Sequence, residues 1–151
     1  MRLVVLTAVF LLLCGVSFIC FGEIAFSVAG RLALSAMFML SGVLHSRYRE
    51  GIYLTYPSFL SQTFRINLVF AISDLQFSFA LAFIFADVAR IITLFVLIYL
   101  FLGLFTQIKA CIKNISVKRG NYTGNGIYYL LFKIPEQLFI ICWTYYFGVV
   151  L

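Results

Sequence analysis

Long apolar runs separated by short polar stretches dominate the pattern of this chain. The first run, Leu3–Gly22, has 20 residues without a charged side chain. As a helix it covers about 30 Å, which is enough to cross the hydrocarbon of a bilayer. It is a retained first span or an uncleaved signal anchor. With four later runs of similar length, the pattern predicts five membrane-spanning helices, at residues 3–22, 24–44, 65–86, 88–108 and 127–150.

The polar stretches predict how these spans are connected. Residues 46–63 mix apolar and polar side chains around the break Tyr56-Pro57, which indicates a short interfacial segment. Only a few residues around Asp87 join spans three and four, so these two helices should be antiparallel neighbours. Residues 109–126 form a basic, glycine-containing loop that matches neither a phosphate-binding loop nor a dinucleotide fingerprint. We expect it to be a flexible cytoplasmic connector.

Composition supports a membrane protein with a single domain covering residues 1–151. The chain is 64% hydrophobic and 11% charged, with a mean hydropathy of +1.11, whereas a soluble domain has about 25% charged residues. Lipid solvates Leu and Phe directly. This large amount of apolar surface is therefore compatible with a helical bundle in a bilayer. The predicted fold class is all-α, and the predicted architecture is a polytopic transmembrane helical bundle. No C-x-x-C pair occurs among the four cysteines, which argues against disulfide exchange.

Basic residues are divided unequally between the two ends of the predicted spans. One end receives seven of them and the other receives two, Arg31 and Arg90. The seven are Arg2, Arg47, Arg49, Lys109, Lys113, Lys118 and Arg119. Cytoplasmic loops carry the excess of Lys and Arg, so the N-terminus should be inside and the C-terminus outside. Topology thus explains the net charge of +6 without a nucleic-acid partner, and the bilayer itself is the expected surrounding.

Polar side chains inside the spans are the candidate functional residues, because each ionisable group there costs about 2.5 to 3.5 kcal/mol on insertion scales. Asp74 shares a helix face with Asn67 and Ser78 near the bilayer midplane, where it serves either helix-to-helix hydrogen bonding or a ligand or proton site. Gln76 faces elsewhere and pairs with a neighbouring helix. The polar-core candidates are His45, Arg65, Asp74, Glu136, Gln137 and Trp143.

Glu136 and Gln137 admit two interpretations. Lys133 and Glu136 are three residues apart, so they can form an ion pair along one helix. Alternatively, Glu136 or Gln137 faces His45, Arg65 or Asp74 across the bundle, and these groups form one shared polar site. Three further residues are assigned to helix packing. Ser35 and Gly42 lie on one face of the second span with His45 and permit close approach, and Pro135 can bend the last span.

Several of these residues resemble motifs of the DoxX-like family of small integral membrane proteins. The segment from Lys133-Ile-Pro-Glu-Gln-Leu to Trp143 and Tyr145 resembles the last helix of that family, usually R-x-P-x-Q followed by a tryptophan. Arg31–His45 is similar to its first helix, Tyr56-Pro57 to its connector, and Ile72-Ser73-Asp74-Leu75 to its acidic segment. The resemblance covers about residues 31–147 and implies a four-helix core to which residues 3–22 add a helix.

The resemblance also sets the functional expectations, because family members are associated with redox complexes and their relatives act as assembly factors. One hypothesis is an accessory subunit of a membrane redox complex, with an intramembrane polar site for a quinone-like or other lipophilic ligand, in a bacterial-type plasma membrane. The alternative is a non-enzymatic scaffold or assembly factor. Partners would be membrane redox proteins or further copies of the chain. With one histidine and no cluster motif we expect no intrinsic haem, metal or iron–sulfur cofactor, only a quinone or lipid. Catalytic residues stay unassigned.

Overall fold

The computed structural model describes residues 2–150, and this part of the chain is helical without a β-strand. The six α-helices are α1 (Arg2–Phe21), α2 (Phe26–Arg47), α3 (Arg49–Ile52), α4 (Gln62–Ala82), α5 (Ala86–Ile112) and α6 (Leu130–Tyr145). Two short 3₁₀ turns, η1 (Tyr53–Thr55) and η2 (Ile127–Tyr129), and a π-helix, η3 (Tyr146–Val150), complete the order. The helices α1, α2, α4 and α5 are each long and apolar enough to span a membrane.

The fifth predicted span is divided in the structure. The α-helical part, α6, ends at Tyr145 and continues directly into η3, so that one helical segment extends from 130 to 150. The preceding residues of the predicted span, from Ile127, belong to the turn η2. Pro135 lies inside α6 on its exposed side, and the helix continues past it.

The connection between α4 and α5 differs from the predicted one. It occupies residues 83–85, whereas the sequence suggested the residues around Asp87. Asp87 instead lies in the first turn of α5, where a carboxylate interacts favourably with the partial positive charge of the helix N-terminus. At the other end, α4 begins at Gln62, before the predicted start, because the Ser61 hydroxyl accepts a hydrogen bond from the Phe64 N–H at 3.3 Å and caps the helix.

The remaining helix ends lie within a few residues of the predicted ones. α1 ends at Phe21, followed by Gly22 with a φ of 73°, a conformation that favours glycine after a helix. α2 extends three residues beyond the predicted end, to Arg47, so the interfacial segment contains only α3, η1 and the chain leading to α4. α5 extends to Ile112, and Asn114 then takes a left-handed φ of 53°.

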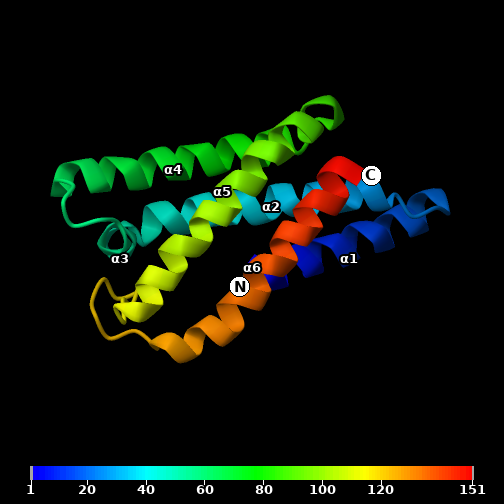
Figure 1. The fold of residues 1–151 in the computed structure, drawn as a ribbon. Helices are drawn as coiled ribbons and strands as arrows, with labels where there is room; N and C mark the ends of the chain where they lie inside the picture. Colours follow the sequence, from blue (N-terminus) through cyan, green and yellow to red (C-terminus); the bar gives the residue numbers. More distant parts are fainter. Residues whose placement is uncertain (1, 151) are drawn as a thin grey trace.

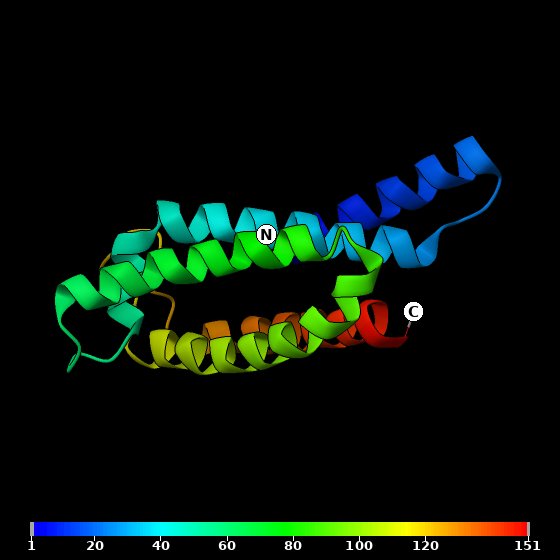
Figure 2. The ribbon, with the colours of Figure 1, turned by 90° about the horizontal axis from the view of Figure 1, so that it is seen from above.

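The helices are arranged in two layers (Figures 1 and 2). α2 is flanked by α1 and α4 in one layer, and α5 packs against α6 in the other. α4 and α5 are antiparallel and contact each other, as predicted, although α4 packs more extensively on α2. α1 starts partway along the bundle and reaches past the beginning of α2, so the loop between them projects from one end (Figure 2).

A continuous apolar core joins the two layers. Leu6 of α1 and Leu34 of α2 are fully buried, together with Phe83 after α4, Val96 of α5 and Ile140 of α6. The outward faces of the long helices are also apolar, as Ile19 illustrates with 83% of its surface exposed. Apolar side chains on both faces are expected where lipid replaces water around the bundle.

Candidate functional site

Two of the predicted site residues of α6, Glu136 and Gln137, bond within the second layer. Lys133 Nζ lies 2.6 Å from Glu136 Oε2 on the same helix. Gln137 is 3% exposed. Its Nε2 donates to the Leu100 carbonyl of α5 at 2.9 Å, and its Oε1 accepts from Gln107 Nε2 of α5 at 3.1 Å. Glu136 is therefore neutralised along its own helix, and Gln137 connects α6 to α5.

Trp143, also on α6, lies in an aromatic cluster far along the helix from the ion pair. Its ring centroid is 4.9 Å from that of Phe10 of α1 and 4.9 Å from that of Phe147. A third ring, Phe139, lies 5.4 Å away. The indole Nε1 is buried without a hydrogen-bond partner among the described residues. This cluster attaches α1 to the C-terminal segment.

His45 and Arg65 lie on the other layer and have separate partners. His45 Nδ1 is 3.2 Å from the Ser41 carbonyl one turn earlier in α2. The Arg65 guanidinium lies 5.2 Å from the ring centroid of Tyr53 in η1, a cation–π geometry. Arg65 Nε is buried without a hydrogen-bond partner. The Arg65–Tyr53 contact attaches the interfacial segment to the start of α4, whereas the His45 contact stays within α2.

Two of the three residues assigned to helix packing, Ser35 and Gly42, lie where α2 meets α4, whereas Pro135 is on the exposed side of α6. Ser35 Oγ donates to the Ala80 carbonyl at 2.6 Å, and the Gly42 carbonyl accepts from Ser73 Oγ at 2.7 Å. A side chain at Gly42 would meet the Phe77 ring at 2.9 Å, so the small residue permits this approach. Hydroxyl-to-carbonyl bonds between helices thus fix the largest interface of the bundle.

Gln76 and Tyr99 form a buried polar pair between α4 and α5. Gln76 is 1% exposed, and its Nε2 donates to the Tyr99 hydroxyl. Its Oε1 is also buried and has no hydrogen-bond partner. Arg2 interacts electrostatically with both Tyr99 and His45, so the start of α1 supplies a cation to this region. The structure confirms that Gln76 pairs with a neighbouring helix.

Tyr56, in the connection before α4, belongs to the same region. It interacts electrostatically with Tyr99, and burial, followed by this interaction, raises the pKa of the Tyr56 phenol well above its usual value. The Tyr56 hydroxyl therefore keeps its proton and is available as a hydrogen-bond donor. Tyr56, Gln76, Tyr99 and Arg2 thus bring several polar groups together in this region.

The signal in the sequence that identifies Gln76 as a site residue is its helical spacing from the other buried residues of α4. Buried residues of α4 recur every three or four positions, and they are Val69, Ser73, Gln76, Phe79 and Ala80. Gln76 lies in the middle of this stripe, whereas Asp74 lies off it. The helical period already places Gln76 and Asp74 on different faces, but it does not indicate which of the two faces is buried.

Asp74, Asn67 and Ser78 lie on the exposed side of α4. They share a helix face, as predicted, but this face is directed away from the rest of the chain. The Ser78 hydroxyl donates to the Asp74 carbonyl oxygen within α4 at 3.0 Å. The Asp74 carboxylate has no ion pair or hydrogen bond to another described residue. We call these three residues the outer polar stripe.

The candidate residues thus have different neighbours on different elements. Asp74 is exposed, Trp143 contacts α1, Gln137 contacts α5, and His45 and Arg65 bond near the interfacial segment. Within residues 2–150, no group of three His, Cys, Asp or Glu side chains is placed to hold a metal ion.

Comparisons of this chain with models of protein families, with curated proteins and with solved structures found no match.

Proposed function

We propose that this chain is a non-enzymatic scaffold or assembly factor of a bacterial-type plasma membrane, which binds a partner through the outer polar stripe. The observation that carries the proposal is the exposed Asp74 within α4, a helix long and apolar enough to span a membrane. Asp74 follows the start of α4 by about 18 Å along the helix axis, near the middle of the span. A charged side chain at that depth is costly unless a partner covers it.

The pairing of polar groups elsewhere supports this proposal. Ser35, Ser73 and Gln137 bond between helices of the chain itself, and Glu136 has its charge partner in Lys133. Those groups stabilise the bundle internally. The Asp74 carboxylate lacks such a partner within the described residues, so a neighbouring transmembrane helix with a cationic or hydrogen-bond-donating side chain would complete it.

The proposal includes the family and topology inferred from the sequence. It takes the chain as a DoxX-like bundle of five spans, in which α6 and η3 form the last span and α1 is the additional helix. The N-terminus lies inside and the C-terminus outside, because Lys109, Lys113 and Lys118 lie at or beyond the end of α5 opposite its Asp87 end.

Reporter fusions test this topology. Alkaline phosphatase, which is active only outside the cytoplasm, should be active when fused after residue 151 and inactive when inserted at Asn121. A fluorescent protein that folds only in the cytoplasm should show the opposite pattern as a control. Active phosphatase at Asn121 would contradict the proposed orientation.

A second candidate function is supported by the unpaired Gln76 Oε1 beside Tyr99. Tyr56, Tyr99 and Arg2 are donors, and Gln76 Oε1 is an acceptor, which are the groups needed to hold the polar ring of a quinone-like molecule. Under this alternative the chain would be an accessory subunit of a membrane redox complex, with the ligand bound between α4 and α5.

Purification from native membranes distinguishes the two functions. Asp74→Leu should reduce recovery of the co-purified partner protein about tenfold, the value of one or two interhelical polar bonds. It should leave the chain folded, because the Asp74 side chain has no internal partner. Asp87→Asn, which removes an exposed carboxylate at the start of α5, is the matched control and should change recovery little.

Mass spectrometry of the same preparations tests whether a lipophilic ligand co-purifies with the chain. Under the scaffold proposal, Gln76→Leu should leave the set of co-purified lipids and quinones unchanged. Loss of a specific quinone in Gln76→Leu, with normal partner recovery in Asp74→Leu, would overturn the scaffold proposal in favour of the ligand-binding subunit.

A further inference from the structure

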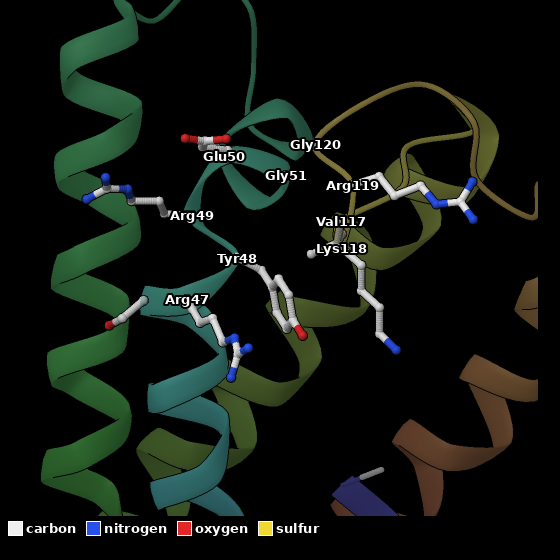
Figure 3. A pocket seen from close by; sticks show the side chains of 10 residues that line it. Arg47, Tyr48, Arg49, Glu50, Gly51, Val117, Lys118, Arg119 and Gly120 are labelled. Atoms are coloured by element: carbon white, nitrogen blue, oxygen red, sulfur yellow. The ribbon is translucent and has the colours of Figure 1, made fainter.

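A cationic cavity lies at the end of the bundle where α2 meets α3. Its volume is about 310 Å³, and the chain between α5 and η2 closes its other side. The lining includes Arg47, Arg49, Lys118 and Arg119, with Tyr48 and the single acid Glu50. We call this cavity the basic cup (Figure 3).

Close backbone packing builds the basic cup. A Cβ atom at Gly51 of α3 would lie 2.0 Å from the Val117 carbonyl oxygen, so only glycine permits the loop to approach this closely. Gly120 lies against Glu50 with a φ of 63°, and Ser116 pairs with Asn121 in an isolated β-bridge. The two walls of the cup are therefore held in a fixed relation by residues far apart in the sequence.

The basic residues of the cup form no ion pair among residues 2–150. The salt bridge found in this part of the chain joins Lys133 to Glu136. The Arg47 guanidinium lies 6.0 Å from the centroid of the Tyr48 ring. Figure 3 shows the Arg47 and Lys118 side chains flanking the Tyr48 ring and extending in the same direction as the Tyr48 hydroxyl. The Arg49 side chain extends toward α4 instead.

The basic cup lies at the ends of two candidate spans. Arg47 is the last residue of α2, and Lys118 follows the end of α5 at Ile112 by a few residues. The headgroups of a bilayer surround such positions, and a tyrosine is favoured there as well. Basic pockets at this level bind the phosphates of anionic lipids. One guanidinium group can donate two parallel hydrogen bonds to two oxygens of a phosphate.

We propose that the basic cup binds the phosphate of an anionic lipid headgroup, with Arg47, Tyr48 and Lys118 as its ligands. Both cations attract the singly charged phosphodiester, and the Tyr48 hydroxyl donates to one of its oxygens. The acyl chains remain in the bilayer beside α2. This site is separate from the outer polar stripe, and it does not require a partner there.

Native mass spectrometry of the full chain, with phosphatidylglycerol or phosphatidylcholine titrated into detergent, tests the site. The wild-type chain should retain phosphatidylglycerol in preference to phosphatidylcholine. Arg47→Gln and Lys118→Gln should each reduce this preference about fivefold. Lys113→Gln is the matched control, because it removes a nearby exposed lysine that does not line the cup, and it should leave the preference unchanged.

Gly51→Ala separates the cup from charge in general. The alanine methyl group would displace the Val117 backbone without altering any charge, so lipid preference should fall as it does in Lys118→Gln. Equal losses in Lys113→Gln and Lys118→Gln would overturn the proposal in favour of diffuse attraction. Equal retention of both lipids would also overturn it, leaving an acidic protein segment as the occupant. Complete displacement by inorganic phosphate would show that a soluble phosphate, rather than a lipid, is bound.

Discussion

Gly30→Val is expected to separate the C-terminal segment from α2 and to reduce the free energy of unfolding by about 3 kcal/mol, the upper end of the range for overpacked cores. A Cβ atom at Gly30 would lie 2.0 Å from Cδ1 of the Phe147 ring, so valine cannot be accommodated without movement. Phe147 cannot easily withdraw, because its ring packs against Phe10 and Trp143 at centroid distances of 5.5 and 4.9 Å. The substitution therefore disturbs α1, α2 and η3 together.

Gly103→Val is the control for this experiment. Gly103 lies within α5, and a Cβ atom there would have no neighbour within 4 Å. Gly103→Val therefore makes the same change of side chain in a long helix without a collision with another ring. Unfolding by sodium dodecyl sulfate in mixed micelles, followed by circular dichroism, should show a large loss for Gly30→Val and little change for Gly103→Val. Similar stabilities of the two variants would contradict the packing of η3 on α2.

The sequence was sufficient to predict the long helices, because runs such as Leu3–Gly22 have both the length and the composition of a span. It was less reliable at their ends. The pattern predicts the α4–α5 turn at Asp87, since a charged residue between apolar runs is typical of a loop. Asp87 is equally suited to the first turn of a helix, where the structure has it.

In a membrane protein, the sequence pattern of a helix does not show which of its faces is buried in the bundle. The period of α4 correctly placed Asn67, Asp74 and Ser78 on one face, but it gave no indication of which face is inside. In a soluble helix the apolar side would identify the core. In α4 both faces carry apolar side chains, because lipid as well as protein accepts Phe and Leu. Tertiary packing, not periodicity, buried Gln76 and exposed Asp74.

Interactions between neighbours in sequence were easier to predict than those between layers. Lys133 and Glu136 lie three residues apart, and they form an ion pair along α6, as the spacing predicts. The pairing of Gln137 with Gln107 and Leu100 depends on how α5 and α6 are docked. A spacing within one helix cannot specify that arrangement.

Phe38→Ala is expected to loosen the contact between the two layers, because Phe38 connects them. The side chain is 1% exposed. Its ring centroid lies 5.8 Å from that of Phe79, 5.9 Å from that of Phe83 and 6.5 Å from that of Tyr99 on α5. Truncation leaves a cavity among these rings and removes a ring that packs against Tyr99, the partner of Gln76.

The expected loss for Phe38→Ala is about 2 kcal/mol, smaller than the 3 to 5 kcal/mol typical of soluble cores. The unfolded helices remain in lipid or detergent, so the ring is not transferred to water and mainly the packing contribution disappears. Phe95→Ala, on the outer face of α5 with 59% exposure, removes the same atoms without a cavity and should be nearly neutral. Stability in mixed micelles would measure both, and equal losses would mean that lipid, not α4 and α5, surrounds Phe38. A loss confined to Phe38→Ala would instead show that this ring is packed between the two layers.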